Sequence, residues 1–273
     1  MPITSRFAPS PTGLLHLGHA FSAWQVRGRA DFMWLRLEDI DPVRCRAAFA
    51  EGILEDLQWL GLGWDGEIRV QSRHLPEYQA ALDILQAMGV VYPCFCSRAE
   101  IARAAAAPHG AEMVYPGTCR HLPPAERAEK IAGGAAHAWR LDVAAARRIT
   151  GPLRFFEEGA GWAPARPERL GDAVLARRDI PTSYHLCVVH DDALQGVSHV
   201  IRGEDLREAM HLHVLLQALL GYPTPVYAHH KLLKNAEGKR LAKRDGAASL
   251  RGLREAGIEA GTIIQQFEDA GAA

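Results

Sequence analysis

Short apolar runs of strand length alternate with helical patterns along the first third of the chain. The predicted strands are 3–7 and 32–37, and the predicted helices are 15–29, 46–60 and 76–88. Glycines close these helical patterns, as is typical of helix ends. Strands that alternate with helices in this way predict an α/β fold with a parallel sheet.

A less regular region separates this part from a second set of elements. Residues 121–170 are rich in Gly, Ala and Pro, and the pattern predicts only short strands there, at 138–141 and 153–156. The later elements are a return to the sheet near Val174, a helix from about Tyr184 to Val189, a strand at 197–201, an amphipathic helix to Leu220, a strand at 226–229 and a helix at 258–267. We therefore predict a doubly wound parallel sheet that carries an insertion and a helical C-terminal segment.

Composition narrows the class of protein only modestly. The 273 residues are 48% hydrophobic and 23% charged, which is an ordinary globular balance. No apolar run is long enough to span a bilayer, and MPITSRFAPS lacks a secretory signal, so we expect a cytoplasmic protein with no membrane partner. The formal net charge is −1, so the overall field would not attract a nucleic acid. Any nucleic-acid partner would therefore have to bind a local basic patch. No long apolar patch stands out, which favours a monomer.

The stretch RFAPSPTGLLHLGH, from Arg6 to His19, joins a strand to a helix start. His16 and His19 are three residues apart, so their rings share one face of the first turn. The free N–H groups of a helix start attract anions, and Gly18 leaves room for a flat base near the backbone. This pattern favours a nucleoside triphosphate site, and the alternative is two surface histidines at a helix start.

Charged residues follow two of the predicted strands. Glu38 ends the strand 32–37, and Arg202 ends the strand 197–201. Because ligands bind at the carboxyl ends of strands in open α/β sheets, Glu38 is a candidate for binding an ammonium group. The alternative for Glu38 is capping of the next helix. Arg202 and Arg6 together would receive a small acidic substrate through bidentate bonds, near Tyr184 in the first turn of its helix.

Three of the five cysteines cluster between Cys94 and Cys119, which in this chain favours a metal over disulfides. Cys94, Cys96 and Cys119 would supply three ligands of a tetrahedral, structural zinc. The residues alone leave the fourth ligand open between three neighbours in the sequence: His109, Tyr115 and His121. The alternative is three reduced cysteines without a metal. Cys45 and Cys187 stand apart, and we expect both to be buried thiols.

A basic loop covers 231–247, with five Lys/Arg residues between Lys234 and Arg244. Lysines on flexible stems can follow phosphates through a transition state, so the loop is a candidate phosphate clamp. The alternative is a solvated basic turn.

Several motifs, taken together, resemble those of the glutamyl branch of the class I aminoacyl-tRNA synthetases. His16-Leu17-Gly18-His19 is similar to the HIGH motif, and Arg240 to Arg244 stands at the KMSKS position. RFAPSPTG, RLEDID, IRGEDL and GKRLAKRDGA also resemble glutamyl-synthetase sequence. The resemblance implies a Rossmann-like catalytic domain in two halves, 1–93 and 171–230. It also implies a zinc-bearing, acceptor-type insertion at 94–170 and a KMSKS-like loop with a helical segment at 231–273.

Within this branch the chain most resembles the glutamyl-Q tRNA(Asp) synthetases. It stops soon after the KMSKS-like loop, without an anticodon-binding domain, and Val188 stands where full glutamyl-tRNA synthetases usually carry Asn. The resemblance implies activation of L-glutamate with ATP and Mg²⁺, and transfer to the queuosine of tRNA(Asp). Two alternatives remain, a short glutamyl-tRNA synthetase that charges a tRNA 3′ end and a non-catalytic glutamate or nucleotide sensor.

The resemblance also implies roles for individual residues. Glutamate would be held by Arg6, Phe7, Ala8, Pro9, Ser10, Glu38, Tyr184 and Arg202. ATP would be bound by His16, Gly18, His19, Arg240 and Lys243, of which His16, His19 and Lys243 would be catalytic. Zinc would be ligated by Cys94, Cys96, Tyr115 and Cys119. Arg240 and Ala242 depart from the KMSKS pattern, and we expect weaker phosphate contacts there without loss of activity, since Lys243 remains.

Overall fold

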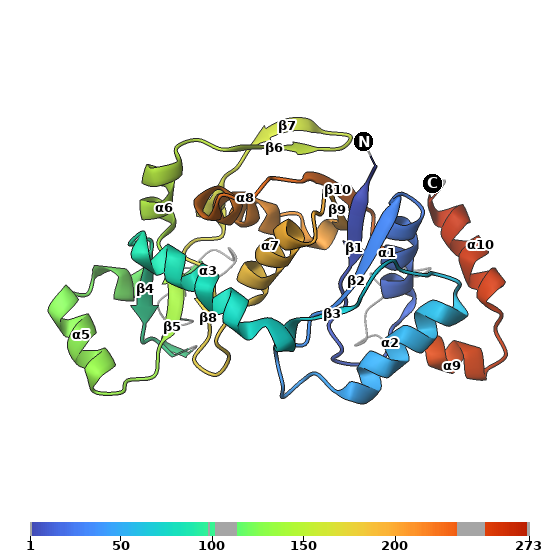
Figure 1. Cartoon of the computed structure of the whole chain (residues 1–273), viewed down its shortest axis with the longest axis horizontal. Coiled ribbons are helices and arrows are strands. Elements are labelled where there is room, and N and C mark those ends of the chain that lie inside the picture. The colour runs from blue at the N-terminus through green and yellow to red at the C-terminus, as the bar shows by residue number, and fades with distance from the viewer. Residues whose placement is uncertain (1, 98, 102–113, 234–248, 272–273) are drawn as a thin grey trace.

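The structure is a computed structural model that describes residues 2–97, 99–101, 114–233 and 249–271 (Figure 1). Its centre is built from two groups of hydrogen-bonded strands that lie side by side. The first has the order β1 (Thr4–Phe7), β2 (Phe32–Leu37) and β3 (Arg69–Val70), all parallel. The second has the order β7 (Gly161–Pro164), β6 (Arg154–Glu157), β10 (Val226–His230) and β9 (His199–Gly203). The Ser198 N–H donates to the Thr4 carbonyl over 3.0 Å, which brings β9 beside β1.

The helices follow strands because each buries an apolar stripe against the sheet. Those of the central domain are α1 (Leu17–Arg27), α2 (Ala47–Trp59), α3 (Leu75–Ala87), α7 (Tyr184–Leu194) and α8 (Ala209–Leu220). Ile53 and Leu57 of α2 are fully buried, as the helical spacing predicts. Nearly all of α8 is buried, so the prediction of an amphipathic helix there was wrong: α3, α6 and α7 all pack on it.

The C-terminal segment packs onto the first helix. It consists of α9 (Leu250–Glu255), which the pattern did not predict, and α10 (Ala260–Gly271). The ring of Phe267 lies 5.5 Å from Phe21 and 6.1 Å from Trp24 of α1. The Leu250 N–H donates to the Leu15 carbonyl over 2.9 Å. These contacts fix the segment beside the helix start that carries the histidines.

A third, antiparallel sheet lies at the other end of the molecule (Figure 1). Its order is β4 (Val91–Cys94), β5 (Ala138–Leu141) and β8 (Val174–Ala176), with α5 (Pro124–Ala132) and α6 (Val143–Thr150) nearby. The expected return to the parallel sheet near Val174 was therefore wrong, since β8 pairs with β5. Conversely, β6 lies within 94–170 but pairs with β10 of the parallel sheet. The insertion is thus interleaved with the central domain.

Short 3₁₀ turns complete the described chain at Gln71–His74, Thr118–His121, Pro167–Arg169 and Glu204–Leu206. Among the described helices, none combines the length and the hydrophobicity that a bilayer crossing requires.

Candidate functional site

A cavity of about 470 Å³ opens at the carboxyl ends of β1, β2, β9 and β10. This is the edge at which open α/β sheets bind ligands. The residues expected to bind glutamate all line it: Arg6, Phe7, Ala8, Pro9, Ser10, Glu38, Tyr184 and Arg202. The expected nucleotide residues His16, Gly18 and His19 line the same cavity. Parts of the chain that are far apart in sequence are therefore brought together in one place.

The spacing of the two histidines predicted that His16 lies in the first turn of the helix. In the structure His16 is instead the N-cap of α1. Its Nδ1 accepts the Gly18 N–H over 3.1 Å, and the His19 Nδ1 accepts the His16 N–H over 3.4 Å. The two rings lie 3.8 Å apart. Because each Nδ1 accepts a backbone hydrogen bond, each neutral ring carries its proton on Nε2. The capping box therefore fixes both rings at the start of α1, the end of a helix whose dipole suits an anion.

Arg6 is paired with the buried carboxylate of Asp192, which was not predicted from the sequence. Its Nε donates to Asp192 Oδ1 over 2.9 Å, and Asp192 also accepts from the fully buried Arg36. Burial acts to raise the pKa of Asp192, but the charges of Arg6 and Arg36 outweigh it and hold the pKa below its ordinary value. The signal was present in the sequence, since Asp191 and Asp192 are adjacent acids that closely follow the apolar run 186–189 of the same helix.

Arg202 is only 4% exposed, yet much of its hydrogen-bonding capacity is unused. Its Nε donates to His229 Nε2 over 3.3 Å. Neither terminal nitrogen of its guanidinium has a hydrogen-bond partner in the described part of the chain. Buried donors are normally satisfied, so this pair of nitrogens marks a position for a ligand carboxylate.

Glu38 supplies the opposite charge in the same cavity. It is 9% exposed, and burial raises the pKa of its carboxyl to about 7, against the lowering effect of Arg36 and Arg6. Burial also raises the pKa of the Tyr184 phenol, which stays protonated and can donate a hydrogen bond. A cavity with a buried guanidinium, a buried carboxyl and a phenol matches a zwitterionic amino acid in charge.

A second cavity, of about 460 Å³, adjoins the first. The two share Ser10, Thr12, Glu38, Arg44 and Tyr184 as lining residues. The second reaches toward β8 through Ala173, Val174 and Arg177, so it lies where the central domain meets the antiparallel sheet. The two cavities therefore adjoin at these shared residues.

Several lining residues were not found from the sequence, Gly203 among them. A Cβ built at Gly203 would lie 2.6 Å from Asp205 Oδ1 and 2.8 Å from Leu232 Cδ2. A side chain at this position would therefore require the ends of the Asp205 and Leu232 side chains to move, and a glycine at the end of a strand could have signalled this close packing. The other lining residues that were not predicted are Thr12, Phe21, Ser22, Arg44, Ile201, Asp205, Leu206, His230, Leu232 and Leu233.

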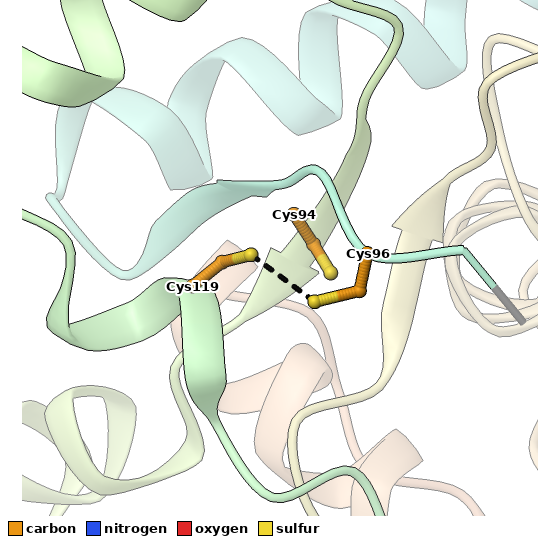
Figure 2. Close-up of side chains that lie close together, drawn as sticks. All are labelled: Cys94, Cys96 and Cys119. Atoms are coloured by element: carbon orange, nitrogen blue, oxygen red, sulfur yellow. Dashed lines mark hydrogen bonds between the residues drawn. The ribbon is translucent and has the colours of Figure 1, made fainter. Parts of the chain in front are cut away.

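The sulfurs of Cys94, Cys96 and Cys119 converge at the end of β4 (Figure 2). They lie within 4.8 Å of one another, and Cys96 Sγ is 3.4 Å from Cys119 Sγ. The Tyr115 hydroxyl oxygen lies 3.3 Å from Cys94 Sγ and 3.6 Å from Cys96 Sγ. The Arg140 guanidinium lies over the Tyr115 ring at 4.0 Å. The three clustered sulfurs are compatible with a zinc site, and the Tyr115 oxygen lies beside them.

Of the other cysteines, Cys187 is buried as expected, but Cys45 is partly exposed, so that expectation was wrong. Cys45 follows the turn after β2, beside the second cavity. His109, Arg240 and Lys243 lie outside the described residues, as does most of the basic loop.

The fold and the cavity together define a class of protein. The family model of the class I tRNA synthetases (E and Q), catalytic domain, matches residues 2–270. The chain belongs to this family, and the predicted fold class, a class I synthetase domain with a parallel sheet, is confirmed.

Two relatives within the family carry the same name. The chain is 47% identical to a glutamyl-Q tRNA(Asp) synthetase of Rhodobacter capsulatus, over 95% of this chain and 97% of that protein. It is 43% identical to one of Symbiobacterium thermophilum, over 96% of this chain and 84% of that protein. A solved glutamate tRNA ligase of Elizabethkingia meningosepticum, in complex with its amino acid, has a TM-score of 0.75 at 28% identity. This chain is matched over 90% of its length but spans only 53% of that ligase.

Proposed function

We propose that this chain is an ATP-dependent ligase that activates L-glutamate as glutamyl-adenylate and transfers the glutamyl group to the queuosine of tRNA(Asp). Glutamate activation is supported by one observation above all. The first cavity sets two terminal nitrogens of Arg202, which have no partner among the described residues, and the buried carboxyl of Glu38 beside the start of α1. An acidic amino acid and a triphosphate are the ligands that such a site suits.

The proposed reaction has two steps. An oxygen of the glutamate α-carboxylate attacks the α-phosphorus of ATP, and the bond to pyrophosphate breaks. A hydroxyl of the queuosine cyclopentenediol then attacks the acyl carbon, and AMP leaves. Positioning and charge neutralisation are the protein's contribution to both steps. His16 and His19 would donate to phosphate oxygens, Mg²⁺ bound with ATP would neutralise charge, and Lys243 would follow the phosphates.

The acceptor is argued from two observations. The relatives that match nearly the whole chain are named for tRNA(Asp), and the second cavity leaves room for a nucleoside beside the activated acyl group. We expect the chain to act as a monomer in the cytoplasm.

The assay that tests the acceptor follows ATP-dependent transfer of labelled glutamate to three RNAs. They are queuosine-containing tRNA(Asp), the same tRNA without queuosine, and tRNA(Glu). We expect label on the first RNA only. Label on tRNA(Glu) would contradict the proposal and indicate a short conventional synthetase. If no RNA is labelled and glutamate-dependent ATP–pyrophosphate exchange is also absent, the chain is a sensor and not an enzyme.

We also propose that Cys94, Cys96, Cys119 and the Tyr115 hydroxyl bind one structural zinc ion. The site joins the end of β4 to the turn at Thr118–His121, an area with a small core of its own. Because the bound metal fastens these segments, its loss destabilises the fold around them.

Replacing Cys119 with serine is expected to lower bound zinc from about one ion per chain to less than about a tenth, with a lower unfolding temperature. The matched control is C45S, which removes a thiol outside the cluster and should retain the metal. Metal analysis of the freshly purified, reduced protein measures both. Equal zinc in C119S and the wild type would refute the ligand set, and Y115F separately tests the hydroxyl.

A further inference from the structure

A row of three polar side chains crosses the parallel sheet and ends at the glutamate cavity. Arg202 on β9 and His229 on β10 are paired in register, and Glu157 comes from β6, the next strand. Arg202 Nε lies 3.3 Å from His229 Nε2, and His229 Nδ1 lies 2.8 Å from Glu157 Oε1. The side chains of His229 and Glu157 are only 2% and 6% exposed. A buried row of this kind is costly unless every hydrogen bond in it is made.

The charges in the row determine which nitrogen of His229 carries the proton. Burial acts to raise the pKa of Glu157, but hydrogen bonds from Arg207 and His229 outweigh it and keep the carboxyl ionised. Burial, and then the charge of Arg202, lower the pKa of His229 to about 4, so the ring is neutral. A carboxylate can only accept, so the single imidazole proton sits on Nδ1. Nε2 then carries no proton, so it can accept the hydrogen bond that the Arg202 Nε–H donates.

This arrangement leaves the terminal nitrogens of the Arg202 guanidinium at the cavity, which Arg202 lines. With Nε bound to His229, the planar guanidinium turns its two terminal nitrogens away from the row, and neither has a partner in the described part of the chain. The guanidinium also lies over the Tyr227 ring at 5.7 Å, and the rings of Tyr227 and His229 are parallel with their centroids 6.4 Å apart. Its orientation is thus set by neighbours and does not depend on a ligand.

We propose that His229 and Glu157 are positioning residues for glutamate recognition: Glu157 selects the imidazole tautomer, and His229 thereby orients Arg202. This inference rests on the proposed function of the cavity. It also extends the glutamate site to β6, a strand of the inserted region, although neither His229 nor Glu157 lines the cavity. Arg207 stabilises the outer end of the row, since its Nε donates to Glu157 Oε1 over 2.7 Å.

The first test compares two replacements of His229 by glutamate-dependent ATP–pyrophosphate exchange. H229L removes the acceptor for Arg202 Nε, and we expect the KM for glutamate to rise at least about tenfold, with the KM for ATP changed by less than about twofold. H229Q places an amide oxygen near the position of Nε2 and should recover much of the loss. Equal increases in both KM values, or no recovery in H229Q, would overturn the proposal.

The second test uses adjacent glutamates as a matched pair. E157Q removes the charge that selects the tautomer and should raise the KM for glutamate by about three- to tenfold, whereas E158Q should not. Glu158 is 37% exposed and pairs with Arg29 at the surface. Nitrogen NMR of labelled histidine should show His229 protonated on Nδ1 in the wild type and a mixture of tautomers in E157Q.

The NMR measurement separates this proposal from the function on which it rests. If the wild type shows no glutamate-dependent exchange, the proposed function fails, while an Nδ1-protonated His229 still supports the row of contacts. If exchange is normal but His229 is protonated on Nε2, or E157Q behaves like E158Q, the positioning role is refuted and the function stands. The unfolding temperature of each variant distinguishes a folding defect from a change at the site.

Discussion

Glutamate-dependent ATP–pyrophosphate exchange should fall by about 10³-fold when Arg202 is replaced by methionine, because a bound carboxylate then loses a buried, bidentate partner. We expect Arg202 to bind the side-chain carboxylate of glutamate, since the α-carboxylate must stay free to attack phosphorus. R202K keeps the charge but loses the planar fork, so we expect an intermediate loss of about 10²-fold.

The stability of R202M, unlike its exchange activity, should not fall. In the wild type, the terminal nitrogens of Arg202 are buried without partners among the described residues, which costs free energy in the unliganded protein. The unfolding temperature of R202M should therefore be at least as high as that of the wild type. R169M is the control, since Arg169 is 52% exposed and pairs with Glu208 at the surface. Full exchange in R202M would exclude Arg202 from the glutamate site.

The sequence allowed the location of the cavity to be predicted because one topological rule connects distant residues. Glu38 and Arg202 are far apart in the chain, but each ends a parallel strand, and such ends share an edge of the sheet. The strand 32–37 and the strand at 138–141 were predicted with the bounds that the structure has. Local pattern was enough for both, since each is a short apolar run between breaks.

What could not be predicted depends on contacts across the sheet. The sequence marks Val174 as the start of a strand, but a short apolar run does not reveal its partner, and β8 joins β5. For the same reason the sequence did not reveal that Asp192 binds Arg6 or that His229 binds Arg202. These pairs interact over long sequence separations. His16 was predicted to lie in the first turn of a helix that begins near Leu15, since only the structure shows its ring accepting a backbone N–H as the N-cap.

The pH dependence of glutamate binding should follow the ionisation of Glu38. Burial raises the pKa of this carboxyl to about 7. The ionised form binds an ammonium group and the protonated form does not, so the KM for glutamate should fall by about tenfold between pH 6 and pH 8. In E38Q this dependence should disappear, and the KM at pH 8 should be about 10²-fold higher than in the wild type.

The stability of the unliganded protein should show the opposite pH trend. The pKa of Glu38 rises on folding from 4.5 to about 7, so the folded state holds its proton more tightly than the unfolded state. The stabilisation is complete below pH 4.5 and is lost as the pH rises to about 7, a change of about 3 kcal/mol. E38Q should lack this loss, and denaturant unfolding at pH 5 and pH 8 measures it.

The two measurements on Glu38 together exclude a merely structural role. A carboxyl that only supported the fold would leave E38Q less stable at pH 8, with the KM values for glutamate and ATP affected alike. We expect E38Q to be more stable at pH 8 than the wild type and weaker only toward glutamate. E67Q, which changes an exposed glutamate, should alter neither quantity. A wild-type KM for glutamate that does not change between pH 6 and pH 8 would show that Glu38 is already ionised in the free site and would refute the raised pKa.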